Sequence, residues 1–560
     1  MFDYIIAGGG VGGCVLANRL SANGRHRVLL LEAGQDIVPG REPADILDIF
    51  PTSFFNKSYM WPGLNVRWGT RANSPAVAYD QARVMGGGSS VMGMVALRGT
   101  PDDYDEWADS GAAGWTWQNV LPYFRKLEDD QNFQGDLHGV NGPVPVRRTP
   151  REEWPPLSRA ISNYAEEHQI PYVADMNGDF RDGYCSVPMA NKRHRASAAI
   201  CYLGAAVRTR PNLTIQSNAT VVKLLMEGRQ AVGVSAIVSG GKQTFAGREI
   251  IVSSGAIQSP KLLMLSGIGP SEDLRALGID VVVDLPGVGR NLQNHAIIHI
   301  GAHLVPSARQ SEHLRSHATS CFRYSSGHPN GSVSDMYMNI HSKSSWSALG
   351  KQIANLSPIL LRPNSRGTVK LASAEARDMP AVEFNILSDQ SDVERLAIGV
   401  IRAVEVLKYD VTRSLYRSAF PIHMTDRLRK LNQKKSGNAA IAKVVASLLD
   451  IFPGFEHLVF NRLTSSQFTL DELIADRARL EQHVRKNAGG MFHPVGTCRM
   501  GAASDRNAVV DSNGNVRNVK SLRVVDASVM PYIPRGNTNI PTTMAAERMA
   551  DLILESSATR

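Results

Sequence analysis

The sequence predicts an α/β protein that begins with a Rossmann-type nucleotide-binding unit. Two observations lead to this prediction. A short apolar run at residues 4–7 leads into a glycine-rich turn and a helical stretch at residues 14–20, and a second apolar run at residues 27–31 ends in the acidic Glu32. Strand, turn, helix and strand in this order are how such a parallel sheet starts. The composition, with 43% hydrophobic and 20% charged residues, is that of an ordinary globular protein.

The glycine turn has the spacing of a dinucleotide-binding site. Gly8 permits the tight turn, Gly10 lets a pyrophosphate approach the backbone, and Gly13 lets helix and strand pack closely. The first turn of the helix then offers unpaired N–H groups to the phosphates. Glu32 follows about 20 residues later, where a carboxylate accepts hydrogen bonds from ribose hydroxyls. The acid favours FAD or NAD over NADP, and the motif alone does not choose between the first two.

Composition and charge exclude several other classes. No run approaches the 18 or so apolar residues of a membrane span, and the first residues lack the pattern of a signal peptide. The net charge of +9 is spread over 61 basic and 52 acidic residues without a basic-aromatic module, so no nucleic acid is expected as a partner. Five scattered cysteines without a CxxC pair predict reduced thiols, no metal site and a cytoplasmic location.

Further motifs lie along the chain. Residues 83–90 read Arg-Val-Met-Gly-Gly-Gly-Ser-Ser, and residues 253–260 read Ser-Ser-Gly-Ala-Ile-Gln-Ser-Pro. Near the end stand His-Pro-Val-Gly-Thr at 493–497 and a segment at 524–542 that contains Asp526, Gly536-Asn537-Thr538-Asn539 and Pro541. This ordered set resembles the glucose–methanol–choline (GMC) family of FAD-dependent oxidoreductases over essentially the whole chain. Within that family the chain looks most like bacterial alcohol oxidases and dehydrogenases.

The resemblance implies FAD as the cofactor and a fold of two discontinuous domains. The Rossmann-type FAD-binding domain would take residues 1–155, 195–300 and 485–560. An α+β substrate-binding domain, built on an antiparallel sheet that roofs the flavin, would take residues 156–194 and 301–484.

Two residues are expected to be catalytic. His493 matches the position of the family's base, and a neutral imidazole suits removal of a hydroxyl proton while a hydride leaves carbon for flavin N5. Asn537 matches a position held by histidine or asparagine, and its amide can bind the substrate oxygen but cannot titrate. Both residues also have a structural interpretation, as a histidine satisfied in a Gly-Pro loop and as a turn-forming asparagine before a helix that Pro541 would begin.

The resemblance also implies a set of cofactor-binding residues beyond the glycine turn and Glu32. Val221 would pack on adenine, which a plain core valine would equally explain, and the positive end of the helix after Asn537 would face the flavin pyrimidine. The full set is Gly8, Gly10, Gly13, Glu32, Ala33, Val84, Gly87, Gly93, Met94, Val95, Val221, Asp526, Ala527, Thr538 and Asn539.

Two residues depart from relatives. Val91 stands where some members attach FAD through a histidine, so the FAD is expected to be non-covalent. Met92 replaces the usual asparagine, which removes a possible amide partner of the flavin. The thiol of Cys498, near His493, is expected to be buried and inert, because no base is indicated beside it.

The expected reaction is oxidation of a primary alcohol, preferably aromatic or furanic, to an aldehyde. Phe492 and Trp61 are candidates for an apolar substrate pocket. Reduced flavin would pass its electrons to O2, giving hydrogen peroxide, or to a quinone-type acceptor. A hydroxynitrile-type lyase and a non-catalytic flavin-binding protein are the remaining alternatives, and the oligomeric state is not predicted.

A basic stretch at residues 427–435 precedes residues 441–460, which are rich in Ile, Val, Leu and Phe. An amphipathic helix over the active-site entrance, an oligomer contact and a peripheral membrane anchor are all compatible with this pattern. The preferred interpretation is a helix packed on the core with a solvated basic lead-in.

Overall fold

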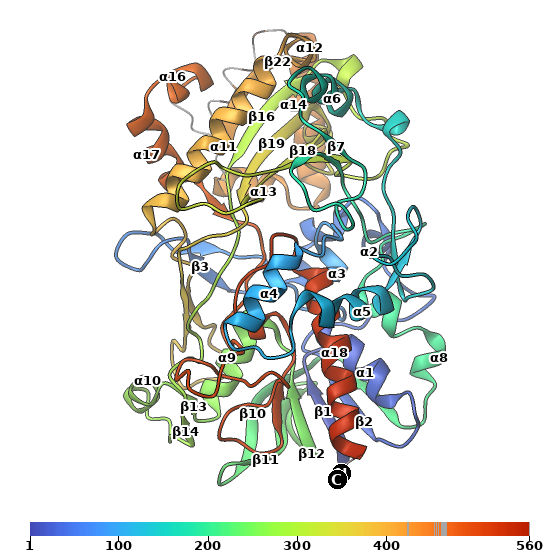
Figure 1. Ribbon diagram of the computed structural model, residues 1–560, viewed down its shortest axis with the longest axis vertical. Helices are drawn as coiled ribbons and strands as arrows, with labels where there is room; N and C mark the ends of the chain where they lie inside the picture. Colours follow the sequence, from blue (N-terminus) through green and yellow to red (C-terminus); the bar gives the residue numbers. More distant parts are fainter. Residues whose placement is uncertain (423–424, 453, 455, 457–458, 461–467, 559–560) are drawn as a thin grey trace.

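The computed structural model covers the whole chain and describes residues 1–422, 425–452, 454, 456, 459–460 and 468–558. Figure 1 shows an elongated molecule with one sheet in its lower half and a second sheet in its upper half. Together they give the mixed α/β architecture predicted from the sequence.

The lower sheet has seven strands in the order β10-β11-β12-β1-β2-β9, with β24 paired to β12. The central strand β1 (Phe2–Ala7) lies parallel to both β2 (Val28–Leu31) and β12 (Gly241–Val252). All four residues of β2 are buried, as expected for a parallel strand covered on both faces. The other strands are β9 (Leu213–Gln216), β10 (Ala219–Glu227), β11 (Gln230–Val238) and β24 (Leu522–Val524).

A helix that packs against this sheet is followed outward by two further helices. The glycine turn opens α1 (Val11–Ser21), the C-terminal helix α18 (Asn539–Ala558) lies along it, and α5 (Trp117–Leu127) contacts α18 in turn. Arg19 of α1 forms an ion pair with the fully buried Glu547 of α18, with 2.7 Å between nitrogen and oxygen. The first and last segments of the chain therefore form one layer.

The upper sheet has nine strands in the order β22-β16-β19-β18-β17-β8-β7, and β15 and β23 extend it. All its pairings are antiparallel except that between β7 and β8. Its strands are β7 (Tyr172–Val173), β8 (Gly183–Ser186), β15 (Ala296–Ile297), β16 (His299–Leu304), β17 (Ser320–Tyr324), β18 (Met336–His341), β19 (Ile353–Leu360), β22 (Tyr416–Ile422) and β23 (Gly489–Gly490).

Side chains alternate across the upper sheet, because successive residues of a strand point to opposite faces. Met336, Met338 and Ile340 of β18 belong to a core cluster under α11 (Gln390–Lys408). Asn339 and His341, which alternate with them along the strand, line the cavity described below. One face of this sheet is thus hydrophobic core, and the other carries polar groups toward the lower half.

A four-stranded sheet joins the two halves at one side and contains β3 (Asn65–Arg67), β4 (Val77–Ala78), β20 (Thr368–Lys370) and β21 (Ala381–Glu383). Two short pairs are β5 (Glu128–Asp130) with β6 (Val144–Val146), and β13 (Ile268–Gly269) with β14 (Val283–Asp284). The remaining helices are α2 (Ala44–Leu47), α3 (Gly88–Val91), α4 (Pro101–Asp109), α6 (Pro156–Glu167), α7 (Ala198–Tyr202), α8 (Ala205–Arg208), α9 (Gly255–Leu265), α10 (Ser271–Ala276), α12 (Asp410–Arg413), α13 (Asp426–Leu431), α14 (Ser436–Ile451), α16 (Leu470–Ile474) and α17 (Arg477–Asn487).

The strands of the lower sheet fall within the segments predicted for the FAD-binding domain, whereas β15 and β23 fall within those segments but pair with the upper sheet. The domain boundaries stay a prediction. The apolar stretch at residues 441–460 is not one helix, because α14 ends at Ile451. Residues 453, 455, 457 and 458 of that stretch lie outside the described residues.

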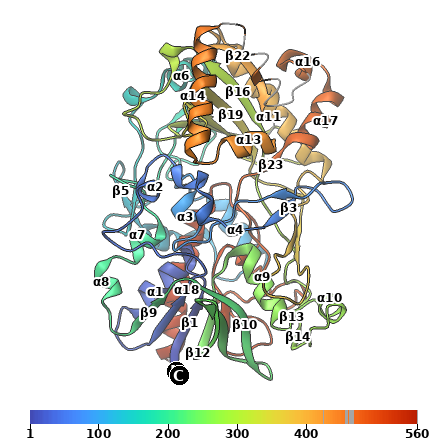
Figure 2. The ribbon, with the colours of Figure 1, turned by 180° about the vertical axis from the view of Figure 1, so that it is seen from behind.

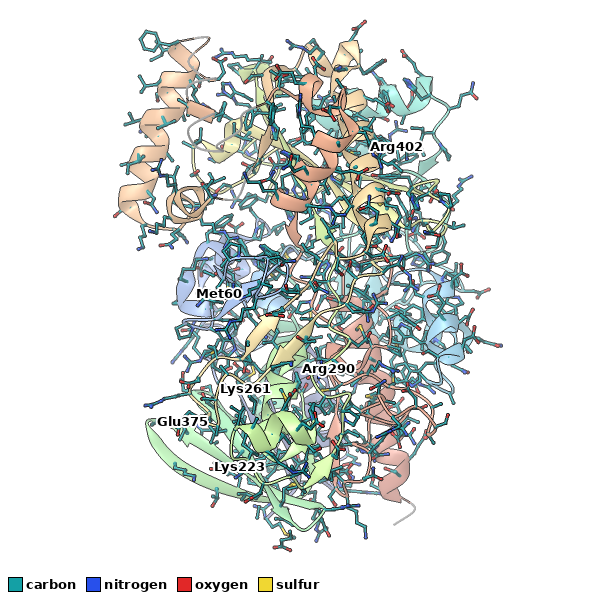
Figure 3. All side chains as sticks on the ribbon, turned by 90° about the vertical axis from the view of Figure 1, so that its left-hand side faces the viewer. Met60, Lys223, Lys261, Arg290, Glu375 and Arg402 are labelled. Carbon is teal, nitrogen blue, oxygen red and sulfur yellow. The ribbon has the colours of Figure 1, made fainter. Side chains whose placement is uncertain are left out.

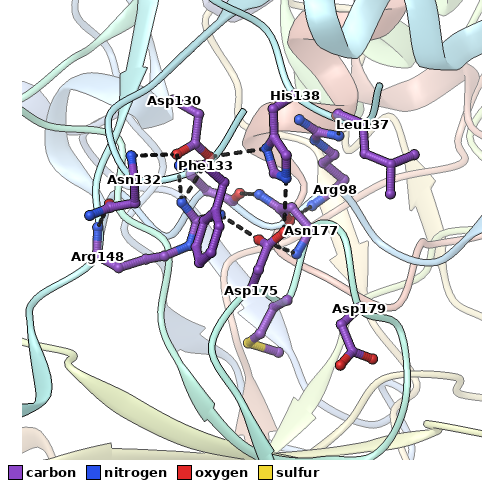
Figure 4. Close-up of polar contacts among 12 residues, drawn as sticks. Arg98, Asp130, Asn132, Phe133, Leu137, His138, Arg148, Asp175, Asn177 and Asp179 are labelled. Atoms are coloured by element: carbon purple, nitrogen blue, oxygen red, sulfur yellow. Dashed lines mark hydrogen bonds and ion pairs between the residues drawn. The ribbon is translucent and has the colours of Figure 1, made fainter. Parts of the chain in front are cut away.

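A buried cluster of charges fastens the loops beside α5 (Figure 4). His138 Nδ1 lies 3.2 Å from Asp130 Oδ2, and its Nε2 lies 2.8 Å from Asp175 Oδ2. The Arg148 guanidinium bridges the same two carboxylates at 2.8 and 2.6 Å. Burial opposes a charge on His138, but hydrogen bonds to Asp130, Asp175 and Glu128 outweigh it and raise the pKa of His138 to about 10.

Glu128, Asp130 and His138 offer ligand atoms that all lie within 4.8 Å of one another, as in a metal site. However, Glu128 is paired with the buried Arg98. Three carboxylates thus face two guanidinium groups and a protonated imidazole, and their charges cancel. The cluster is a charge-balanced, buried ion-pair network.

We predict that His138→Gln lowers the free energy of unfolding at pH 7 by about 3 kcal/mol, because it leaves buried carboxylates undercompensated. Since the folded-state pKa lies above that of an unfolded histidine, the wild-type advantage is full below about pH 6.5 and disappears as the pH rises through about 10. Guanidinium titrations across this range measure it. His328→Gln, which removes a more exposed histidine–carboxylate contact with Glu394, is the control and should cost less. An advantage that grew with pH would refute the assignment.

Candidate active site

A cavity of about 930 Å³ lies between the two sheets and takes its walls from both. At one end it is lined by the glycine turn and Glu32, and elsewhere by His493 and Asn537. Lys261 and Glu375, labelled in Figure 3, also line it, and Lys261 Nζ donates to the carbonyl of Ala376 at 2.7 Å. Segments from the whole length of the chain therefore meet in one space.

The glycine turn is built from backbone contacts that leave no room for side chains. Gly8 has φ +115°, and a Cβ there would lie 2.4 Å from the carbonyl oxygen of Ser253. A Cβ on Gly13 would lie 1.9 Å from the carbonyl oxygen of Gly8, so this glycine allows α1 to approach β1. Gly10 caps α1 without a side chain, and Gly10, Val11 and Gly12 line the cavity. This positive helix end suits a pyrophosphate.

Glu32 directly follows β2 and is only 7% exposed. Its carboxylate accepts hydrogen bonds from the backbone N–H groups of Gly9 at 2.8 Å and Gly34 at 2.7 Å. Burial raises the pKa of Glu32, and the two N–H donors oppose that shift. The carboxylate is therefore held rigidly at the cavity wall. There the two hydroxyls of a diol could donate hydrogen bonds to it in place of the water that burial excludes.

The residues predicted to contact the cofactor can now be placed. Gly13 does not line the cavity and instead packs against Gly8. All the others do line it: Gly8, Gly10, Glu32, Ala33, Val84, Gly87, Gly93, Met94, Val95, Val221, Asp526, Ala527, Thr538 and Asn539. Their individual roles toward a cofactor stay predictions. Cys498 is buried as expected, and burial raises the pKa of its thiol.

Asp526 uses both carboxylate oxygens within the protein. Oδ2 accepts from the Gly255 N–H at 2.9 Å and from the Ser259 hydroxyl at 2.6 Å, and Oδ1 accepts from the Ser528 N–H at 2.8 Å. The side chain thus fastens the start of α9 to the turn after β24. Its predicted contact with the cofactor would have to come mainly from the backbone around it.

His493 is held in place by the loop that follows β23. Phe492 has φ +60°, a left-handed conformation that is rare for a bulky residue and clusters at functional sites. The Phe492 ring packs against Tyr79 and Phe54, with centroids 5.1 and 5.4 Å apart. The backbone N–H of His493 donates to Asn294 Oδ1 at 3.0 Å. Both ends of this turn are therefore fixed.

A chain of hydrogen bonds joins His493 to two other residues. His295 Nε2 lies 3.1 Å from the Pro534 carbonyl oxygen, and His295 Nδ1 lies 2.9 Å from His493 Nδ1. On the other side, His493 Nε2 lies 3.1 Å from the amide nitrogen of Asn537. The three side chains come from three distant parts of the sequence.

The order of donors along this chain follows from its ends. A carbonyl only accepts, so His295 Nε2 carries the proton and His295 Nδ1, in the neutral ring, accepts. His493 Nδ1 must then be the donor to His295, which leaves a lone pair on His493 Nε2. The Asn537 amide N–H, which only donates, points at that lone pair. The arrangement presents His493 Nε2 as a proton acceptor in the cavity.

Both histidines are neutral at physiological pH. Burial lowers the pKa of His493 to about 4. Burial, and then the neighbouring His493, lower the pKa of His295 well below its usual value. His493 therefore keeps its lone pair down to a pH of about 4.

Neutral polar side chains of the upper half form the opposite wall. His299 lies on β16, Asn339 and His341 on β18, and His317 in the loop before β17. Burial lowers the pKa of His299 and of His341 to about 4, and that of His317 well below its usual value. His317 Nδ1 is buried with no hydrogen-bond partner among the described residues. A ligand group could satisfy it.

Apolar side chains complete this part of the cavity, and Phe492 and Trp61 line it as predicted. The carboxylates that line the cavity within the described residues are Glu32, Asp80, Glu375 and Asp526, and none comes from the upper sheet. The polar wall is thus uncharged.

Sequence reasoning missed His295 and the polar wall. His295 ends the run Asn291-Leu-Gln-Asn-His, directly before the apolar residues 296–298. A run with four polar side chains directly before a buried strand indicates a polar site. The role of His295 nevertheless depends on His493, which lies 198 residues away in the sequence. In β18 the alternation Met-Tyr-Met-Asn-Ile-His shows which residues share a face, although not what that face covers.

These features together define an oxidoreductase that uses a dinucleotide cofactor. A nucleotide fits the glycine turn and Glu32, and the same cavity leads to a neutral histidine that can accept a proton beside an amide donor. Gly10 and Gly87 lie so close that a Cβ added to Gly87 would be 3.0 Å from the Gly10 Cα. This part of the nucleotide site is therefore formed by backbone.

Comparisons with known proteins agree. Residues 2–297 and 363–546 match two family profiles that are both described as GMC oxidoreductase. The chain belongs to the GMC oxidoreductase family, and it is an FAD-dependent oxidoreductase that acts on CH–OH groups. This confirms the resemblance seen in the sequence.

Individual relatives cover nearly the whole chain. The 5-(hydroxymethyl)furfural oxidase of Methylovorus sp. is 38% identical over 578 residues, with 99% of each chain covered. The oxygen-dependent choline dehydrogenase of Photobacterium profundum is 32% identical over 586 residues, with 99% of this chain and 93% of that protein covered. The crystal structure of pyridoxine 4-oxidase from Mesorbium loti is 26% identical, has a TM-score of 0.79 and covers 98% of both chains.

We predict that Glu32→Ala weakens FAD binding by about tenfold or more, because it removes the acceptor for the ribose and leaves two backbone donors unpaired. Fluorescence titration of the apoprotein with FAD measures the dissociation constant. Asp36→Asn is the control, since this nearby carboxylate is paired with Arg208 and does not line the cavity. Unchanged FAD affinity in Glu32→Ala would refute the assignment.

Proposed function

We propose that the protein oxidises an uncharged primary alcohol, aromatic or furanic, to the aldehyde, with non-covalently bound FAD and with O2 as the final acceptor. The observation that carries this proposal is the chain from the Pro534 carbonyl through His295 and His493 to Asn537. It leaves the lone pair of His493 Nε2, which accepts from the Asn537 amide, facing the cavity that the nucleotide site shares.

In this proposal His493 Nε2 takes the hydroxyl proton of the substrate. The Asn537 N–H, which donates to His493 Nε2 across 3.1 Å, would turn its donation to the substrate oxygen when the hydroxyl approaches. Protonated His493 would keep its Nδ1–H bond to His295, so the imidazolium is stabilised where it forms. FAD, when bound by the residues around the glycine turn, supplies the two-electron acceptor for the alcohol carbon.

The polar wall supports a substrate with a second hydrogen-bonding group. His317 Nδ1 and the Asn339 amide can bind a carbonyl or hydroxyl oxygen at the end of the molecule remote from the reacting carbon. The name of the Methylovorus relative describes such a substrate, a furan that carries both a hydroxymethyl group and a carbonyl. A permanently cationic alcohol such as choline is disfavoured, because the upper sheet contributes no carboxylate to the cavity.

Two further features of the proposal rest on smaller observations. Val91 is fully buried and does not line the cavity, which supports an FAD that is not attached at this position. The five cysteines are free thiols, four of them buried, which supports a cytoplasmic location.

The test is an anaerobic panel of primary alcohols added to the FAD-loaded protein while flavin absorbance is followed. We expect 5-(hydroxymethyl)furfural and benzyl alcohols to bleach the flavin, and His493→Ala to slow bleaching by about 10²–10⁴-fold because the general base is lost. His313→Ala, an exposed histidine outside the cavity, is the control. Turnover without bleaching would indicate a lyase. Peroxide yield in air, against quinone reduction without O2, decides the acceptor.

The two variants His295→Gln and His295→Leu should differ. A glutamine side chain can donate to the Pro534 carbonyl and accept from His493 Nδ1, so we predict kcat/KM within a few-fold of wild type. Leucine can do neither, so His493 would lose its fixed tautomer, and kcat/KM should fall about tenfold or more. Steady-state kinetics at constant FAD occupancy measure both. Equal losses in the two variants would show that His295 serves packing alone.

A further inference from the structure

The outer face of α14 is apolar, although it is exposed. Ile441, Val444, Leu448 and Ile451 recur at three- and four-residue spacing, and their exposed fractions are 54, 60, 36 and 65%. Phe452, which follows the helix, is 56% exposed. Solvent-facing helix surfaces of globular proteins are normally polar, so an apolar stripe of this length indicates that something covers it.

The opposite face of α14 anchors the helix to the upper sheet. The only charged side chains of the whole helix are Lys443 and Asp450, and Asp450 is paired with Arg309 at 3.0 Å. The exposed stripe therefore carries no charge. The face toward the sheet packs on Ile353 and Phe420 through the buried residues Ala442, Ala446 and Leu449. The interpretation of a core-packed helix explains this inner face but not the outer one.

Basic residues lie in the segment that leads into α14 and on the helix itself. Residues 427–449 contain six basic side chains and no acidic one. Five of these side chains are exposed, namely Arg427, Lys430, Lys434, Lys435 and Lys443. The whole chain carries a formal net charge of +9. An apolar helix face with lysines beside it has the pattern of a helix that lies in the interface of an anionic bilayer.

We propose that α14, with the basic residues that precede it, docks the protein on an anionic lipid surface. A second copy of the chain is a poorer occupant, because a symmetric contact through this face would bring the two basic segments together. The lysines would instead meet lipid phosphates, while the side chains of the stripe enter the acyl boundary. Among the described residues no helix is both long and apolar enough to cross a bilayer, so the helix would lie along the surface.

The docking face adjoins the wall of the active-site cavity. The Lys434 N–H donates to the Phe55 carbonyl at 3.1 Å, and Arg429 Nη1 donates to the Ala78 carbonyl at 2.8 Å. Phe54, which precedes Phe55, and Tyr79, which follows Ala78, line the cavity. Figure 2 shows α13 and α14 in front of the upper sheet, above the segment with α2 and α3, and Figure 3 shows Met60 of that segment on the same side as α14. Docking would bring this wall close to the lipid.

Sedimentation of the FAD-loaded full chain with vesicles tests the proposal. We expect binding to vesicles that contain phosphatidylglycerol, weaker binding in high salt, and little binding to pure phosphatidylcholine. Val444→Glu with Ile451→Glu should reduce binding at least tenfold. Lys430→Glu with Lys435→Glu should reduce it at least fivefold for each charge. Oxidation of a water-soluble alcohol should be unchanged, because none of these residues lines the cavity.

Two matched controls carry the same chemical changes elsewhere. Val333→Glu changes a valine that is 69% exposed, and Lys223→Glu changes a lysine in the half of the molecule remote from α14 (Figure 3). Both should bind vesicles like wild type. The proposal would be overturned if the wild-type protein did not bind vesicles that contain phosphatidylglycerol. It would also be overturned if the variant with both Val444→Glu and Ile451→Glu bound them as well as wild type does. A dimer in sedimentation velocity that this variant abolishes, without vesicle binding, would assign the face to a second copy instead.

Discussion

The hydrogen bond between the Nδ1 atoms of His295 and His493 is the constraint on which the active site depends. It works because the Pro534 carbonyl accepts from the far side of His295, which makes the nearer nitrogen an acceptor. Without that order His493 could present either a proton or a lone pair to the cavity. With it, the ring presents the lone pair, and no ionised group is needed to enforce the choice.

Much of the architecture serves to place the hydrogen-bonded residues His295, His493 and Asn537 beside the nucleotide site. The two histidines lie beyond the same end of the β15–β23 pairing, in which Ala296 lies opposite Gly490 and the Met491 N–H donates to the His295 carbonyl at 3.0 Å. Asn537 lies two residues before the start of α18, the helix that packs on α1 behind the glycine turn. The same helix contacts thus position one end of the cavity for a pyrophosphate and the other for the reacting alcohol. The left-handed Phe492 is the local strain that this convergence requires.

Local motifs could be predicted from the sequence, and contacts between distant segments could not. The glycine turn and Glu32 lie within one strand–helix–strand unit, so spacing alone places them. His493 and Asn537 are predicted from family motifs, and in the structure His493 Nε2 lies 3.1 Å from Asn537 Nδ2. The local pattern at His295 does not reveal its role, because that role arises from two partners on other segments, His493 and Pro534. For α14, periodicity shows an apolar face but not whether the protein buries it, and only the folded structure shows that the stripe is exposed.

The most direct test of this account is the tautomer of His493 in the FAD-loaded protein. Long-range ¹H–¹⁵N correlation spectra of the histidine rings, with the signal assigned by its loss in His493→Asn, report which nitrogen carries the proton. The account predicts a neutral ring protonated at Nδ1, with Nε2 bare at neutral pH. A ring protonated at Nε2, or a charged ring, would contradict it.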